Sequence, residues 1–481
     1  MSEQGDESNK QERTPGPTTR LATFLATSRL GDIPAAVMTR AAHITLDGIG
    51  CALVGAHLPW SARAVEAVSR LESAGPAVVV GWDRGLTPTA AALLNGTFIQ
   101  GFELDDYHEL GPLHSASVVL PAAFATTSAL ERQVSGAELA LAIALGFEVG
   151  PRLGVAMRGH AMLGHGWHSG AVYGGLAAAV AAAKLRGLDA GGFEDAISIA
   201  GTQASGLMSA QFESMVKRMN HAFGARNGVL AAALAESGFT GIKDVLEREY
   251  GGFFAMFADD HLTDVDAVSA DLGKRWELMN ILVKPYASGG TTHPVADALL
   301  RARNELGIRA ENIASMTIRL THDSFQHNGW RLERPTTSIG AQLNVAYVAA
   351  VALLDGAVFV PQFSSSRMDA DDVWSVIYRT VVIHDVDVDE LAARSATPRA
   401  TRVSIERIDG STEELEVLEA KGTRNLALSN AEIRSKFHGL VTELIGQSRA
   451  DEIERRTLGL IELDSAEDLI GLLAEGVKAV S

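Results

Sequence analysis

The chain has 481 residues, of which 47% are hydrophobic and 21% charged, a composition that can bury a large core and that argues against global disorder. Its 41 basic and 59 acidic residues give a net charge of −18 without an evident basic stripe, so no nucleic-acid partner is expected. The longest run of small residues, 170–183, is shorter than the about 20 residues of a membrane span, so no membrane is expected either. The single cysteine, Cys51, excludes an intramolecular disulfide framework and is expected to be buried. These features favour a cytoplasmic globular enzyme.

The first half of the chain is predicted to be helical after a polar tail. Residues 1–19 are polar and lack the apolar core of a secretory signal, so we expect a disordered tail outside the fold. From Ile33 onward apolar residues recur at helical spacing, interrupted only by a strand-like stretch at 77–82. Further helices are predicted over residues 115–130, 137–156, 170–186, 193–207, 226–237 and 242–250.

The pattern changes after about Met279. Strands are predicted in residues 316–325, 380–390 and 402–419, the last folded into a hairpin at Asp409 and Gly410, with a helix over 342–354 among them. Helical periodicity returns at 431–444 and 465–480. The sequence therefore predicts a mainly α protein with two parts. Residues 20–280 and 428–481 form a large all-helical domain, and residues 281–427 form a smaller α+β domain inserted into it.

Many histidines and several cations of this acidic chain collect in five short, mostly glycine-containing stretches. These are residues 103–115, 159–170, 206–228, 284–294 and, more weakly, 321–330. Lysine and arginine form strong charge-assisted hydrogen bonds with carboxylates. The clustering therefore predicts one site that binds negative charge.

His114 and His168 each stand directly before a serine that opens a helix of small residues. Ser115 and Ser169 are good N-caps, and free N–H groups at a helix start attract anions. An imidazole beside them is placed to meet a carboxylate or to donate a proton to it. The alternative is that each ring only packs at its helix start and bonds a backbone carbonyl.

Several cations of these stretches have both a functional and a structural interpretation. Lys217 could pair with a substrate carboxylate, whereas for its neighbour Arg218 we expect a solvated helix face. Lys284 lies at the predicted domain junction, a common place for a substrate cleft, and His293 follows in the same stretch. Taken alone, Lys284 fits a structural role as well.

Acidic residues and histidines also raise the alternative of a metal-dependent hydrolase. Carboxylate and imidazole ligands of this kind can hold zinc, manganese or iron. The flanking glycines, however, do not fix the histidines on one helical face, and no metal is predicted. The residues of this alternative are Asp105, Asp106, His108, His165 and His168.

Six stretches, in this order, resemble the MmgE/PrpD family, and the resemblance covers nearly the whole chain from about residue 21. They are LDGIGCALVGA (46–56), ELDDYHELGPLHSASVVLPAAFA (103–125), GHGWHSGAVYG (164–174), GLMSAQ (206–211), MVKRMNHAFGARNG (215–228) and YASGGTTHP (286–294). Within the family, LDDYH, PLHSASVVLPA, GWHSGAVYG and GLMSAQ are most similar to the fungal-type cis-aconitate decarboxylase branch.

The resemblance implies a homodimer whose active site lies between a helical domain and a lid domain, without a cofactor. It implies that a small tri- or dicarboxylate binds there and that the catalytic residues are His114, His168 and Lys217. The predicted substrate-binding residues are Asp105, Asp106, His108, Lys284 and His293.

The activity implied is decarboxylation of cis-aconitate to itaconate and CO2, with His114 as general acid and Lys217 and Lys284 on carboxylates. One departure from the family pattern leaves the identity of the proton donor open. Mammalian relatives place a histidine shortly after the junction lysine, where this chain has Ser288, Gly289 and Gly290. Dehydration of 2-methylcitrate or epimerisation of a dicarboxylate are alternatives within the family, and the metal-dependent hydrolase is the alternative from another class.

Overall fold

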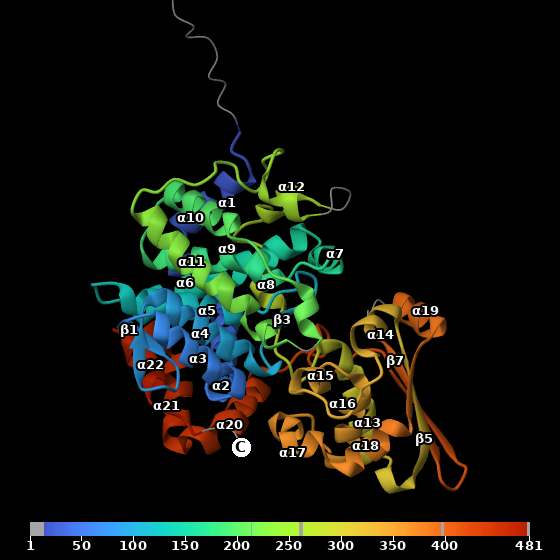
Figure 1. Ribbon diagram of the computed structural model, residues 1–481. Coiled ribbons are helices and arrows are strands. Elements are labelled where there is room, and N and C mark those ends of the chain that lie inside the picture. Colours follow the sequence, from blue (N-terminus) through green and yellow to red (C-terminus); the bar gives the residue numbers. More distant parts are fainter. Residues whose placement is uncertain (1–13, 213, 259–262, 396–398, 479–481) are drawn as a thin grey trace, which may run out of the picture.

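The computed structural model describes residues 14–212, 214–258, 263–395 and 399–478. They form two bodies that lie against each other, a larger one made mostly of helices and a smaller one that combines a sheet with helices (Figure 1). The predicted fold class, mainly α with a smaller α+β part, is confirmed. The domain boundaries at 280/281 and 427/428 stay predictions.

The larger body is built from helices of both ends of the chain. The first group comprises α1 (Pro17–Thr27), α2 (Ala35–Gly55), α3 (Pro59–Leu71), α4 (Pro88–Ile99), α5 (Ala116–Ala129), α6 (Gly136–Ala156), α7 (Gly159–Gly164), α8 (Ser169–Val172), α9 (Gly174–Leu185), α10 (Ala190–Thr202), α11 (Asn220–Glu236) and α12 (Phe253–Phe257). The second comprises α20 (Asn430–Ile445), α21 (Gln447–Leu458) and α22 (Glu467–Ala474).

The centre of this body is formed by α4, α5, α9 and α11, which pack on one another. Helix α9 is buried at every position except Lys184, as expected for a helix that is apolar on all sides. Glycines bring the backbones close: a Cβ on Gly96 of α4 would lie 2.9 Å from the Cα of Ala222 in α11. Because α11 follows directly on the short 3₁₀ segment η4 (Met215–Met219), this packing fixes the position of Lys217.

The C-terminal helices rejoin the larger body, as the sequence predicts. Helix α20 packs on α2, and the buried Lys436 ammonium lies 2.7 Å from a carboxylate oxygen of Asp47. The same ammonium donates a hydrogen bond of 2.6 Å to the backbone oxygen of Leu104. This buried ion pair therefore holds the chain next to the predicted acidic motif.

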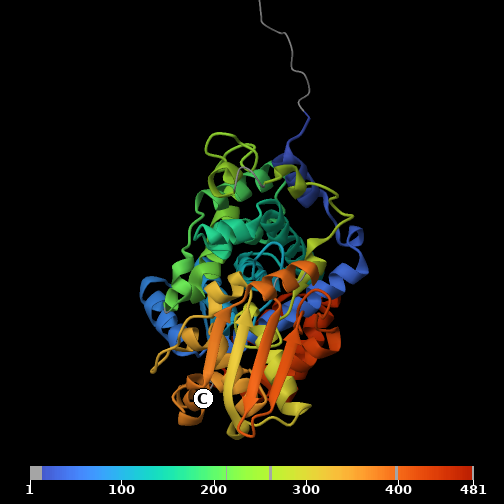
Figure 2. The same ribbon diagram turned by 90° about the vertical axis from the view of Figure 1, so that its right-hand side faces the viewer.

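The smaller body contains a four-stranded sheet, seen face-on in Figure 2. Its strands are β5 (Ile313–Leu320), β6 (Thr380–His384), β7 (Thr401–Arg407) and β8 (Thr412–Val417), in the order β6-β5-β7-β8. Its helices are α13 (His293–Asn304), α14 (His322–Asn328), α15 (Ser338–Gln342), α16 (Val345–Asp355), α17 (Ser365–Met368), α18 (Asp371–Tyr378) and α19 (Val386–Ser395).

Strand β5 runs parallel to β6 and antiparallel to β7, and β7 and β8 form the predicted hairpin. Gly410, with φ of 83°, lies in its turn. Burial alternates along β5 and β7, and α13 and α16 pack against these strands and their neighbours. One face of the sheet is thus covered by helices.

The structure corrects several predicted elements. Residues 242–250 form turns in place of a helix, since Asp244 adopts a left-handed φ of 53° that interrupts helical geometry. The predicted strand over 380–390 ends at His384, because the Asp385 side chain accepts a hydrogen bond of 3.0 Å from the backbone of Asp387 and starts α19.

Two domain details also differ from the prediction. The larger body is not all helical, because β1 (Ala74–Val79) and β2 (Arg84–Leu86) form an antiparallel hairpin in it at the strand-like stretch. Helix α1 begins inside the predicted tail, and Thr18 is fully buried. Residues 1–13 of that tail lie outside the described residues.

Helix α6 is long and apolar enough to span a membrane by length and composition. Its most apolar stretch is 94% buried among the other helices, so it serves as a core helix of this fold. Cys51 of α2 is buried, as predicted.

The start of α5 differs from the predicted serine cap. The Ser115 side chain makes no capping bond. Instead, the buried Asp106 carboxylate accepts hydrogen bonds of 2.7 and 2.9 Å from the backbone N–H groups of Ser115 and Ala116. The anion-binding capacity of this helix start is therefore used by the protein itself.

Replacing Asp106 by alanine is expected to lower the free energy of unfolding by about 1–2 kcal/mol, because two buried N–H groups lose their acceptor. Ser115→Ala is the matched control and should have less than half that effect, since its hydroxyl caps nothing. Thermal and denaturant unfolding measure both. A larger loss for Ser115→Ala than for Asp106→Ala would contradict the observed cap.

Candidate active site

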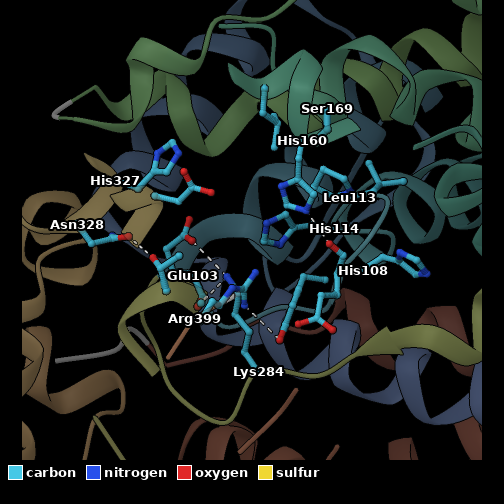
Figure 3. A pocket seen from close by; sticks show the side chains of 18 of the residues that line it. Glu103, His108, Leu113, His114, His160, Ser169, Lys284, His327, Asn328 and Arg399 are labelled. Atoms are coloured by element: carbon cyan, nitrogen blue, oxygen red, sulfur yellow. Dashed lines mark hydrogen bonds and ion pairs between the residues drawn. The ribbon is translucent and has the colours of Figure 1, made fainter. Parts of the chain in front are cut away.

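A cavity of about 900 Å³ is lined by residues of all five predicted polar stretches. The stretch 103–115 leaves the larger body and is held to the junction by β3 (Tyr107–His108), which pairs with β4 (Ile281–Leu282). Stretches 159–170 and 206–228 come from the larger body, whereas 284–294 and 321–330 lead into the smaller one. The predicted convergence of these stretches is thus confirmed, and Figure 3 shows part of the lining.

The predicted site residues divide into two groups. Five line the cavity, namely His108, His114, His168, Lys217 and Lys284. Three are buried behind it and do not line it, namely Asp105, Asp106 and His293. The predicted direct contact of these three with a substrate is therefore not supported by the structure.

Each of the three buried residues has a partner of its own. Asp105 lies against His114, and Asp106 caps α5. Burial and the neighbouring Asp105 carboxylate raise the pKa of Asp106 to about 7. The His293 ring approaches the backbone oxygen of Ser288 at 3.3 Å and makes an edge contact with Tyr286. These contacts position the cavity wall.

His108 also has its ring nitrogens engaged. Its Nδ1 accepts a hydrogen bond of 2.9 Å from the N–H of Gly111, and its Nε2 lies 3.4 Å from a carboxylate oxygen of Glu277. The hydrogen bond to His108 lowers the pKa of Glu277 to about 2. His108 therefore ties β3 to the 277–282 segment while lining the cavity.

Three cations converge on one buried carboxylate, that of Glu103. The ammonium of Lys217 pairs with Glu103 Oε1, Arg218 Nη1 lies 2.8 Å from the same oxygen, and Lys284 Nζ lies 3.3 Å from Oε2. One carboxylate cannot balance three cations, so the group attracts further negative charge. Figure 3 shows Glu103 and Lys284 close together in this part of the cavity.

The structure corrects the solvated position predicted for Arg218. Its side chain is fully buried, bonded to Glu103 and, at 2.6 Å, to the side-chain oxygen of Gln342, and its guanidinium lies over the ring of Trp60. Burial lowers the pKa of Arg218 to about 10. An arginine in these surroundings remains charged at neutral pH and strengthens the field of the cluster.

The imidazoles of His114, His221 and His168 form a second cluster. The rings of His114 and His168 each make an edge contact with His221, at 4.8 Å between centroids. Burial, and then the proximity of His114, lowers the pKa of His168 to about 3. Burial together with both neighbours lowers the pKa of His221 as well. These two rings are therefore neutral near pH 7.

His114 has a different partner. Its Nδ1 lies 3.1 Å from Asp105, and its side chain is 20% exposed, whereas Asp105 is fully buried. Against the effect of burial, the charge of His114 and its hydrogen bond hold the pKa of Asp105 below its usual value. An ionised carboxylate on Nδ1 fixes the ring, as in sites where imidazole transfers a proton through its other nitrogen.

The metal alternative is not supported by the arrangement of the side chains. Across the four described ranges, no three His, Cys, Asp or Glu side chains are grouped as metal ligands. Asp105 and Asp106 are directed at His114 and at the start of α5, and His108 is directed at Glu277. His165 is exposed and is not part of the cavity lining.

The main residues that sequence reasoning missed are Glu103, His221 and Arg399. Glu103 and His221 lie inside predicted stretches, but nothing in the sequence distinguishes them from their neighbours. Arg399 lies outside every predicted stretch and reaches the cavity from the smaller body. Residues 418–425 contribute to the same wall without a recognisable motif.

The comparisons with known proteins agree with this architecture. Residues 19–264 match the MmgE/PrpD N-terminal domain, and residues 286–460 match the MmgE/PrpD C-terminal domain. The chain belongs to the MmgE/PrpD family. The two matched regions meet at the segment that carries Lys284.

Similar proteins cover almost the full length of this MmgE/PrpD chain. The cis-aconitate decarboxylase-like protein oryM of Aspergillus oryzae is 41% identical over 472 residues, covering 95% of this chain and 97% of that protein. The cis-aconitate decarboxylase of Aspergillus terreus is 41% identical over 494 residues, covering 100% and 99%. The cis-aconitate decarboxylase of Homo sapiens is 26% identical over 469 residues, covering 95% and 94%.

The environment of Lys284 predicts a pH dependence. Burial lowers the pKa of its ammonium to about 8, although the charge of Asp105 opposes this. The ammonium is charged below that pH and loses its charge above it. For an anionic substrate, kcat/KM is therefore expected to fall as pH rises through about 8.

Lys284→Arg is the matched variant for this prediction, because its guanidinium keeps its charge over the accessible pH range. Initial rates measured from pH 6 to pH 10 should show the alkaline decline in the wild-type protein and a weaker one in the variant. An identical decline in both would assign it to another group.

Proposed function

We propose that the protein catalyses the decarboxylation of cis-aconitate to itaconate and CO2 without a cofactor. The observation that carries the proposal is the cationic group of Lys217, Arg218 and Lys284, whose two lysines line the cavity beside the Asp105–His114 pair. The proposal is supported by relatives that are 41% identical over nearly the whole chain, one named cis-aconitate decarboxylase and one named cis-aconitate decarboxylase-like protein.

The chemistry defines what the site must supply. The bond between the methylene carbon and its carboxylate breaks, CO2 leaves, and the electron pair passes into an allylic anion conjugated with a remaining carboxylate. One proton then adds to the former vinyl carbon, and the double bond ends at the methylene carbon. Catalysis requires groups that bind the anion more strongly than the substrate, together with one proton donor.

Lys217 and Lys284 are the groups that would hold carboxylates and stabilise the anion. Each ammonium has three N–H donors, so either can bond Glu103 and still bond a substrate oxygen. Arg218 is committed to Glu103 and Gln342 and adds charge without needing to touch the substrate. Glu103 therefore acts as a positioning residue that keeps the cations together.

His114 is the residue that would deliver the proton. Asp105 fixes its Nδ1, and its side chain is the partly exposed member of the imidazole cluster. His168 is neutral because burial lowers its pKa to about 3. It can therefore orient a substrate carboxylate by hydrogen bonding without forming an ion pair with it.

The proposal is tested by incubating chelator-treated protein with cis-aconitate and no added cofactor, while CO2 release and the proton NMR spectrum are followed. Itaconate and CO2 in equal amounts are expected. No reaction with cis-aconitate, together with dehydration of 2-methylcitrate, would move the activity to the dehydratase alternative. Turnover restored only by added metal would favour the metal-dependent alternative.

We also propose that the protein works as a homodimer in the cytoplasm. Exposed apolar side chains of η3 (Met208–Gln211), η4 and their flanks support a subunit contact, among them Leu207, Phe212, Met215 and Val216. Light scattering of the purified protein should give twice the mass of the chain, and cell fractionation tests the location. A monomer in solution would contradict the assembly.

A further inference from the structure

Arg399 lies two residues before β7 in the smaller body and lines the cavity between the two bodies. Its guanidinium carbon lies 5.2 Å from the ring centroid of Tyr107, and its Nη1 lies 3.5 Å from the Tyr107 hydroxyl. Tyr107 is itself fixed, because β3 pairs with β4 and the Tyr107 hydroxyl donates to the backbone oxygen of Gly422 at 3.1 Å. The contact with this ring therefore holds the guanidinium in one orientation.

This guanidinium has no acidic partner in the part of the chain that the structure describes, where no carboxylate oxygen lies within 4.0 Å of it. The nearby Glu419 carboxylate is occupied, since it accepts hydrogen bonds from Thr423 and Asn425 at 2.7 to 3.0 Å. Arg399 thus differs from Lys217, Arg218 and Lys284, which all share Glu103. It presents a charge and a planar pair of donors to the cavity without a carboxylate in direct contact, although Glu109 and Glu419 line the same cavity.

Gly290 makes room for this arrangement. A Cβ at residue 290 would lie 2.8 Å from Nη1 and 3.5 Å from Cζ of Arg399. The φ of Gly290 is not positive, so the backbone does not itself require glycine here. What the missing side chain provides is space for the guanidinium.

We propose that Arg399 is a carboxylate-binding residue of this site and that the missing side chain of Gly290 gives its guanidinium access to the cavity. This inference rests on the proposed function and adds a carboxylate anchor contributed by the smaller body. Planar guanidinium groups bind carboxylates through two parallel hydrogen bonds. Arg399 holds a carboxylate that stays in the product. An ion pair with the carboxylate that departs as CO2 would stabilise its negative charge, and this charge has to leave that group in the reaction.

The test is Arg399→Gln, which retains a polar side chain of similar length. Loss of a charged hydrogen-bond pair is expected to raise KM for cis-aconitate by about 10- to 100-fold, with kcat changed less than KM. Inhibition by itaconate should weaken by a similar factor, because the bound carboxylate stays in the product. Unchanged KM and unchanged itaconate inhibition would overturn the proposal.

Gly290→Ala tests the same site without removing the arginine. It should raise KM by a smaller factor in the wild-type background and leave KM unchanged in the Arg399→Gln background, since both changes act on one guanidinium. An equal increase in both backgrounds would contradict the role of Gly290. Arg402→Gln is the matched control, because Arg402 lies three residues further along the chain in β7, pairs with Glu416 and does not line the cavity.

The carboxylate anchor and the proposed decarboxylation are tested separately by calorimetry with propane-1,2,3-tricarboxylate. This saturated analogue cannot form an allylic anion. Weaker binding to Arg399→Gln than to the wild-type protein supports the anchor even if cis-aconitate is not turned over. Equal binding to both proteins contradicts it even if cis-aconitate is turned over. Absence of turnover by the wild-type protein counts against the proposed function alone.

Discussion

Replacing His114 by glutamine is expected to lower kcat by about 10²- to 10⁴-fold, the range that a positioned general acid contributes. Glutamine can still bond Asp105 but cannot transfer a proton near neutral pH. KM should change far less, because Lys217 and Lys284 remain to hold the substrate. Steady-state rates of CO2 release measure both constants.

A second histidine, His165, provides the matched control for this variant. His165 is exposed and does not line the cavity, so His165→Asn should retain wild-type kcat. Full activity of His114→Gln would remove His114 as proton donor. Loss of activity in His165→Asn would revive the metal-dependent alternative, of which His165 is a member.

Replacing Lys217 by methionine is expected to lower kcat by about 10²- to 10³-fold, the cost of removing one donor aimed at a developing charge in a buried site. The side chain is 9% exposed, and burial with the charges of Arg218 and Lys284 lowers the pKa of its ammonium, whereas Glu103 beside it favours the charged form. Methionine keeps the packing volume and removes the charge.

Two further measurements make this prediction specific. Lys274→Met, at an exposed position outside the cavity, should retain activity. Unfolding of Lys217→Met should stay close to that of the wild-type protein, since Glu103 keeps Arg218 and Lys284 as partners. A Lys217→Met enzyme with unchanged kcat would contradict a catalytic role of this lysine.

The sequence predicts where the site forms better than how its residues interact. The five polar stretches meet because clusters of histidine, glycine and cations are unusual in an acidic, alanine-rich chain, and that contrast is visible in the sequence. His114 and His168 are placed correctly beside helix starts. The predicted serine caps are wrong: Ser169 is the first residue of α8 and this helix start has no side-chain cap, and at α5 Asp106 takes the place of Ser115. Asp106 reaches the N–H groups of α5 through a loop conformation that no residue spacing encodes.

The remaining differences have the same physical origin. Arg218 is predicted on a solvated face, but Glu103 pairs with it across 115 positions of chain and draws it into the interior. Arg399 has no motif around it, and only the folding of the smaller body brings it to Tyr107. Contacts between distant segments decide which of several equivalent cations becomes part of a site.

The most direct test of the account is the reaction of cis-aconitate in D2O, followed by NMR while CO2 is measured. Protonation of the former vinyl carbon by an exchangeable donor such as His114 predicts itaconate with one deuteron in the methylene group beside the carboxylate, formed in step with one CO2. Release of no CO2, or a hydrated product in place of itaconate, would contradict the proposed decarboxylation.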